Sequence, residues 1–103
     1  MKPSIALSSN RAVIRALVSE HGLQNPRVFG SVTRREDTEL SDLDILVDPL
    51  PNTSLLDLAK LQLSLEKQLG IHVDVLTPNA LPESFRNQEP FLLKIKKIHK
   101  KNT

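Results

Sequence analysis

The sequence contains no cysteine, tyrosine or tryptophan, and phenylalanine supplies its only three aromatic side chains. Without cysteine the chain can build neither a disulfide framework nor a thiolate zinc site, which fits a reducing compartment, and we expect the cytoplasm. Three rings are too few for a surface on which single-stranded bases stack, so direct nucleic-acid binding is not expected. No stretch approaches the roughly 20 apolar residues of a membrane-spanning helix, which argues against a membrane location.

The length of 103 residues predicts a single domain over residues 1–103, with no room for a separate substrate-binding domain. The net charge of +2 hides an asymmetry: residues 1–93 carry 12 acidic and nine basic side chains, whereas residues 94–103 carry five lysines and no acid. The basic tail, about residues 91–103, is predicted to form an amphipathic helix whose lysines stabilise the negative end of its dipole. Contact of this tail with an acidic partner surface or RNA is the alternative.

Two carboxylates lie two residues apart within the apolar run at residues 41–47 (SDLDILV). Because side chains at i and i+2 of a strand share a face, Asp42 and Asp44 are predicted side by side, while Leu43 and Ile45 face the other way. Adjacent carboxylates repel each other unless a cation lies between them. Mg²⁺ binds through one or two carboxylates together with substrate phosphates. The pair therefore predicts a magnesium site.

A small turn precedes this pair at Gly30 and Ser31, directly after the apolar strand predicted at residues 27–29. Glycine lets the backbone approach a phosphate closely, and the serine hydroxyl and backbone N–H groups can donate to its oxygens. Arg34 is the candidate for neutralising phosphate charge, because a guanidinium binds phosphate oxygens as a fork. Arg35 is the weaker candidate, and both arginines could instead form a solvated cluster with the acidic residues that follow. The turn and the carboxylates together predict a metal–nucleotide site.

At this spacing the residues resemble the signature of the DNA polymerase beta-like nucleotidyltransferase superfamily, and more closely its minimal nucleotidyltransferase branch, the antitoxin partners of HEPN toxins. That branch reads Gly-Ser-x-Ala-Arg-Gly, a short loop, and then Ser-Asp-x-Asp-x-x-Val. The positions that match are Gly30, Ser31, Arg34, Ser41, Asp42, Asp44 and Val47. Thr33 and Arg35 depart from the pattern. The resemblance spans about residues 10–80, and the third carboxylate of the family falls on Asp74.

The resemblance implies roles for the three carboxylates and for the Gly-Ser turn with Arg34. Two Mg²⁺ ions would be held by three carboxylates, those of Asp42, Asp44 and Asp74. Asp74 would also act as the base that prepares the attacking hydroxyl. ATP would be bound by Gly30, Ser31 and Arg34. The implied reaction is a Mg²⁺-dependent transfer of a nucleoside monophosphate, AMP from ATP, to a tyrosine of a cognate HEPN toxin, so that the protein acts as a type VII antitoxin.

Two other functions remain open. The chain could keep the fold and neutralise a partner toxin by occlusion, with little turnover, and Arg35 in place of glycine is compatible with such drift. It could also be a subunit of a small-molecule nucleotidyltransferase, although no substrate-binding domain follows. His72 is predicted on the face of Asp74, but a single histidine in a strand more often has a structural role. Ser41 is predicted to cap or orient the loop before Asp42.

Hydrophobic periodicity predicts a helix over residues 8–21, with its apolar side formed by Ala12, Val13, Ala16 and Leu17. Strands are predicted at residues 27–29, 42–47 and 71–76, with a turn at residues 25–26. A leucine helix is predicted from Thr53 or Ser54 to Gly70, with Leu55 on its core side, and a last helix from Pro90. The order of elements predicts an α/β fold, a small mixed β-sheet packed against helices, which is also the polymerase beta-like nucleotidyltransferase order.

Overall fold

The computed structural model describes residues 1–29 and 36–80, and the backbone of residues 93–94. These parts form three α-helices, a short 3-10 helix and four strands. In chain order the elements are α1 (Pro3–Ser9), α2 (Arg11–Glu20), β1 (Leu23–Phe29), β2 (Leu43–Pro49), α3 (Leu55–Leu69), β3 (Val73–Leu76), η2 (Pro78–Ala80) and β4 (Leu93–Lys94).

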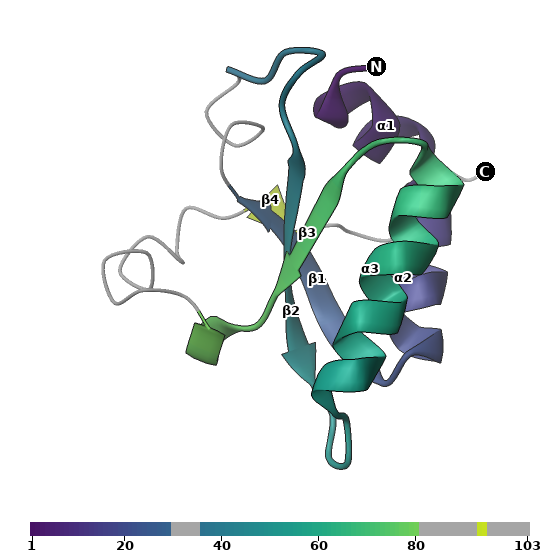
Figure 1. Cartoon of the computed structure of the whole chain (residues 1–103), viewed down its shortest axis with the longest axis vertical. Helices are drawn as coiled ribbons and strands as arrows, with labels where there is room; N and C mark the ends of the chain where they lie inside the picture. Colours follow the sequence, from purple (N-terminus) through teal and green to yellow (C-terminus); the bar gives the residue numbers. More distant parts are fainter. Residues whose placement is uncertain (30–35, 81–92, 95–103) are drawn as a thin grey trace, which may run out of the picture.

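The strands form one mixed sheet in the order β3-β2-β1-β4. β1 is antiparallel to β2 and to β4, whereas β2 is parallel to β3 because α3 carries the chain back between them. Helices α2 and α3 cover one face of the sheet (Figure 1). This arrangement confirms the predicted α/β fold with a small mixed sheet.

The hydrophobic core lies between this sheet face and the helices. Alternate residues of the strands supply one side of it, with Leu43, Ile45 and Val47 of β2 fully buried. The other side comes from α2 and α3 and from Ala6 of α1. Since alternate strand residues face opposite ways, burying this set leaves the side chains between them on the other face of the sheet.

Helix α3 begins and ends as predicted. Ser54 forms a capping box: its hydroxyl accepts from the backbone N–H of Asp57 (3.3 Å), and the Asp57 carboxylate accepts from the backbone N–H of Ser54 (2.9 Å). Gly70 ends the helix in the left-handed conformation, with φ 72°. Leu55 does not belong to the core side as predicted, since it is 83% exposed at the first position of the helix.

The N-terminal region differs from the prediction of one helix over residues 8–21. It forms two helices that meet at Asn10, and the first, α1, begins with Pro3 in its first turn, a position that proline favours. The buried residues of α2 are Ile14 and Val18 rather than the predicted alanines, which are exposed. Larger apolar side chains remove more surface from water, so they set the orientation of the helix.

Strand β1 runs through the turn predicted at residues 25–26. The register with β2 shifts between Gln24 and Arg27, and Asn25 there has a positive φ of 55°. Asparagine tolerates this conformation. Pro26, which has no backbone N–H, is accommodated here because the hydrogen bonds between the strands are interrupted at the register shift. Beyond the irregularity Arg27 is buried, with its Nη1 2.9 Å from Asp48 Oδ1 in β2.

The C-terminal prediction fails at Leu93–Lys94, where the backbone is strand β4, antiparallel to Arg27 and Val28 of β1, rather than helix. The free edge of β1 offers backbone hydrogen bonds that a local periodicity pattern does not reveal. The rest of the predicted tail, residues 91–92 and 95–103, lies outside the described residues. No helix within the described ranges is both long and apolar enough to cross a membrane.

Candidate active site

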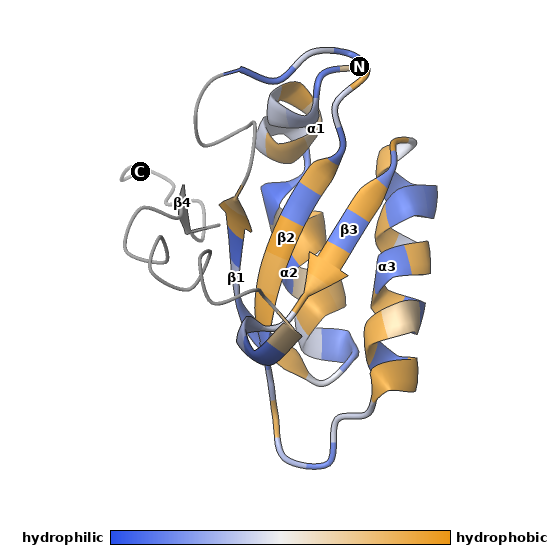
Figure 2. Ribbon diagram, turned by 60° about the vertical axis from the view of Figure 1, so that its left-hand side comes forward, coloured by the Kyte–Doolittle hydropathy of each residue, from blue (hydrophilic) through white to orange (hydrophobic). Residues whose placement is uncertain are grey.

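Two of the predicted carboxylates are brought together by the parallel pairing of β2 with β3. In this register Asp44 is the partner of Asp74, while Leu43 pairs with Val73 and Ile45 with Val75. The apolar partners are buried in the core, so the paired aspartates lie on the opposite face of the sheet. A hydrophilic band crosses each of these neighbouring strands at about the same level in Figure 2. Two features therefore bring the carboxylates together: side chains alternate between the two faces within each strand, and the register of β2 with β3 places Asp44 beside Asp74.

Asp42 joins this pair from the residue before β2. One ligand atom from each of Asp42, His72 and Asp74 lies within 4.8 Å of the others. Asp42 and His72 are exposed, and Asp74 is partly buried. The structure therefore gathers the predicted carboxylates Asp42, Asp44 and Asp74 at one end of β2 and β3, with a histidine among them.

The carboxylates perturb one another electrostatically. Burial, followed by the charge and hydrogen bond of Asp74 and the charge of Asp42, raises the pKa of Asp44 to about 6, and the nearby His72 opposes this shift. For His72, partial desolvation disfavours the charged ring. The surrounding carboxylates of Asp42, Asp74 and Glu66 outweigh it, so the pKa of His72 lies above its usual value. The site has an excess of negative charge.

This donor set suits a divalent cation. Hard cations such as Mg²⁺ take carboxylate oxygens as ligands, and Asp42, Asp44 and Asp74 provide them from two adjacent backbone segments. The raised pKa of Asp44 follows first from burial and then from the charges of Asp74 and Asp42, and a bound cation would oppose both effects by favouring the charged carboxylate. The residues present therefore fit the metal that the family resemblance implies.

Hydrogen bonds hold the loop that leads into Asp42. The Ser41 hydroxyl accepts from the backbone N–H of Thr38 (2.9 Å), and the backbone N–H of Ser41 donates to the Thr38 carbonyl (3.1 Å), which confirms the predicted orienting role of Ser41. The same loop is attached to α1, because Asp37 Oδ2 accepts from the backbone N–H of Ser4 (2.9 Å), and this bond lowers the pKa of Asp37. Helix α1 thus supports the approach to the site.

The predicted phosphate-binding residues Gly30, Ser31 and Arg34, and the weaker candidate Arg35, lie outside the described residues. The described part of β1 ends at Phe29, whose register partner in β2 is Asp44. The Gly-Ser pair therefore begins one residue after a position paired with a site carboxylate.

Sequence reasoning did not single out Glu66, which contacts His72. Glu66 Oε2 lies 2.6 Å from His72 Nδ1, and His72 Nε2 lies 3.3 Å from Asp74 Oδ1. The available signal was the position of Glu66 one residue after the buried Leu65 in the last turns of a helix that leads directly into β3. That placement brings a helix side chain beside the start of the following strand.

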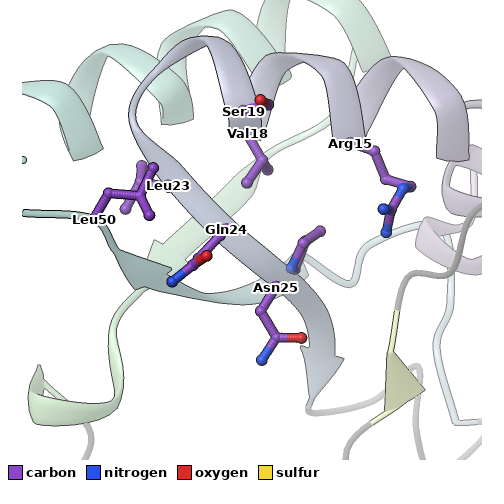
Figure 3. Close-up of a pocket in the computed structure, with 8 residues that line it drawn as sticks. Arg15, Val18, Ser19, Leu23, Gln24, Asn25 and Leu50 are labelled. Atoms are coloured by element: carbon purple, nitrogen blue, oxygen red, sulfur yellow. The ribbon is translucent and has the colours of Figure 1, made fainter.

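A separate hollow of about 270 Å³ lies between α2 and β1 (Figure 3). Of the predicted site residues that the structure describes, Asp42, Asp44 and Asp74, none lines it. Its lining residues are Arg15, Val18, Ser19, Leu23, Gln24, Asn25, Pro26 and Leu50. The hollow borders the irregular part of β1, and it is distinct from the carboxylate cluster.

Comparison with known proteins identifies the class. The nucleotidyltransferase domain family matches residues 11–102, and the chain belongs to this family. It is a nucleotidyltransferase. The "putative protein adenylyltransferase MJ0435" of Methanocaldococcus jannaschii is 46% identical over 71 residues, which cover 69% of this chain and 75% of that protein. The "protein adenylyltransferase MntA" of Thermococcus cleftensis is 40% identical over 67 residues, which cover 65% of this chain and 68% of that protein.

Solved structures share the fold. A structure described as that of a "putative minimal nucleotidyltransferase" superposes with a TM-score of 0.78 at 38% identity, covering 91% of this chain and 95% of the other. A toxin–antitoxin structure with AMP-PNP superposes with a TM-score of 0.71 at 20% identity, covering 86% and 74%. The second likeness bears on the fold alone. The minimal nucleotidyltransferase resemblance drawn from the motifs is confirmed.

Proposed function

We propose that this nucleotidyltransferase transfers AMP from ATP to a hydroxyl of a partner protein, with Mg²⁺, and that the acceptor is a tyrosine of a cognate HEPN toxin. The protein would then act as a type VII antitoxin, and the toxin would be both its substrate and its partner. The observation that carries the proposal is the convergence of Asp42, Asp44 and Asp74 at one end of two adjacent strands.

The three carboxylates would hold two Mg²⁺ ions. When bound, these ions would neutralise charge on the triphosphate and stabilise the attacking and leaving oxygens. Asp74 would take the proton of the acceptor hydroxyl while the hydroxyl oxygen forms a bond to the α-phosphorus of ATP. The bond from the α-phosphorus to the oxygen that bridges to the β-phosphate would break, and pyrophosphate would leave. Gly30, Ser31 and Arg34 would hold the phosphates in place for this transfer.

The protein acceptor is supported by the names of two relatives, which are called protein adenylyltransferases. The toxin partner is supported by the toxin–antitoxin structure with the same fold, which holds AMP-PNP. The tyrosine and the HEPN type rest on the family resemblance of the motifs. The single-domain organisation over residues 1–103 and the cytoplasmic location remain predictions.

The test is incubation with α-labelled ATP and Mg²⁺, with and without the candidate HEPN partner. Wild type should label the partner, and the double variant Asp42→Asn/Asp44→Asn should not. Glu39→Gln is a matched control, since it removes an exposed acid from the same loop, and it should label like wild type.

Two outcomes would overturn the proposal. Equal labelling by the double variant would show that the carboxylates are not the site. No labelling by wild type, with tight binding to the partner retained in both proteins, would leave neutralisation by occlusion as the function.

A further inference from the structure

The titratable side chains of Glu66, His72 and Asp74 link helix α3 to the carboxylate cluster through a continuous series of contacts. Glu66, near the end of α3, accepts a hydrogen bond at Oε2 from the backbone N–H of Val73 (3.1 Å). The same oxygen lies 2.6 Å from His72 Nδ1, and His72 Nε2 lies 3.3 Å from Asp74 Oδ1. Each ring nitrogen of His72 therefore faces a different carboxylate.

Of these three side chains, that of Glu66 is the most firmly held, and those of His72 and Asp74 are more exposed. The Glu66 side chain is 24% exposed and is attached to the first residue of β3 by the Val73 contact. The His72 side chain is 55% exposed and that of Asp74 is 42% exposed. Without contacts, an exposed histidine and a partly exposed aspartate would each keep several rotamers, so the two contacts of the ring restrict both side chains. Glu66 supplies the anchor on the helix.

We propose that Glu66 and His72 are positioning residues that hold the carboxylate of Asp74 in the orientation its role requires. The inference rests on the proposed function, because it concerns the base and metal ligand of that reaction. Carboxylate and histidine partners outside the ligand set orient ligands in many metal sites, and their loss typically lowers metal affinity or activity by about 10–100-fold. The oxygen preference of Mg²⁺ leaves the imidazole free to bind Asp74 rather than the ion.

If these contacts had a purely structural role, breaking them would lower the free energy of unfolding and would leave metal binding unchanged. Exposed ion pairs contribute little to stability, so we expect instead that breaking the contacts of His72 leaves the unfolding transition nearly unchanged. If His72 positions Asp74, the loss should instead appear in metal binding and in the rate of transfer.

The experiment compares His72→Ala, His72→Gln and Glu66→Gln with wild type in the full chain. His21→Ala is the matched control, because His21 also bonds through Nδ1, to the Leu17 carbonyl at the end of α2, away from the cluster. Mn²⁺ binding is followed by electron paramagnetic resonance without substrate, and AMP transfer to the partner is followed with labelled ATP.

We expect His72→Ala to weaken Mn²⁺ binding and to lower kcat by about 10-fold, with KM for ATP unchanged. His72→Gln, which can still donate one hydrogen bond to Asp74, should recover part of the loss, and Glu66→Gln should show a smaller loss of the same kind. His21→Ala should match wild type in both measurements.

Mn²⁺ binding and kcat of His72→Ala equal to those of His21→Ala would overturn the inference. Nitrogen hyperfine coupling to the bound Mn²⁺ that disappears in His72→Ala would also overturn it, because the ring would then be a ligand. If wild type binds Mn²⁺ but transfers no AMP, the proposed function fails, whereas the Mn²⁺ titrations still decide whether His72 positions Asp74.

Discussion

At the scale of single residues, Asp44 shows the conflict between folding and function in this site. It is half-buried, and its register partner is another carboxylate, Asp74. Its pKa of about 6 follows first from burial and then from Asp74 and Asp42, so in the metal-free protein its charged form opposes folding. A bound cation would reverse that effect. The residue is therefore unfavourable for the stability of the metal-free protein, and in the proposed function the same negative charge would favour metal binding.

We expect Asp44→Asn to stabilise the metal-free protein near neutral pH by about 1 kcal/mol, a figure reduced from the full shift because solvent screens this half-buried site. The folded pKa of about 6 lies above the unfolded value of 3.8, so the folded state binds the proton more tightly. The stability that Asp44 contributes is fully present below pH 3.8 and is lost as pH rises through 6. Asparagine does not titrate.

Urea unfolding in the presence of a chelator, at several pH values from near 4 to near 7, measures this difference. The advantage of Asp44→Asn over wild type should grow across that range and then level off. Glu39→Gln, in an exposed position, should not gain stability in this way. An advantage of Asp44→Asn that is the same at every pH would contradict the assignment of the raised pKa to this group.

At the scale of elements, local chemistry determined what the sequence could predict. The ends of α3 were predicted because each depends on the chemistry of one residue. Ser54 has a hydroxyl that can cap a helix, and Gly70, which has no side chain, can adopt a positive φ. The path of β1 through Asn25 and the edge pairing of β4 depend on bonds to distant segments. A short strand has no local signal strong enough to reveal such pairing, so a helix was predicted at Leu93–Lys94 instead.

The capping box of α3 gives a prediction at this scale. Ser54→Ala removes the acceptor for the Asp57 N–H, and it should lower the free energy of unfolding by about 1 kcal/mol. For a domain of this size that corresponds to a decrease in Tm of roughly 4–8 °C. Thermal unfolding followed by circular dichroism provides the measurement. Ser9→Ala at an exposed position is the control, and an equal decrease in both variants would show that the cap contributes nothing specific.

At the scale of the whole molecule, the candidate site depends on the topology of the sheet. The motif at residues 41–47 predicted that Asp42 and Asp44 lie on one face, and the family resemblance added Asp74. Neither the pairing of Asp44 with Asp74 nor the contact of Glu66 with His72 could be predicted, because both require β3 to lie parallel to β2 after α3. Alternation fixes which face a side chain occupies, whereas register fixes which side chains meet.

Since the carboxylates of the candidate site come from β3 and from β2 with the residue before it, two segments that are far apart in the sequence and are joined through α3, a ligand bound there should stabilise the whole domain. A ligand that binds only the folded state, present at about 100 times its Kd, adds about 2.7 kcal/mol to the free energy of unfolding. We therefore expect Mg²⁺ with ATP to raise the Tm of wild type by several degrees, and a chelator to abolish the increase. The double variant Asp42→Asn/Asp44→Asn should start at a similar or higher Tm, because like charges are removed, and should show no increase.

Differential scanning fluorimetry with ATP alone, Mg²⁺ alone and both together separates the contributions. Glu39→Gln should respond like wild type, which excludes a general effect of removing negative charge near the loop. A ligand-induced increase in the double variant as large as that of wild type would mean that the nucleotide binds without the carboxylates. In that case the cluster on β2 and β3 would not be the nucleotide site, even though the fold is that of a nucleotidyltransferase.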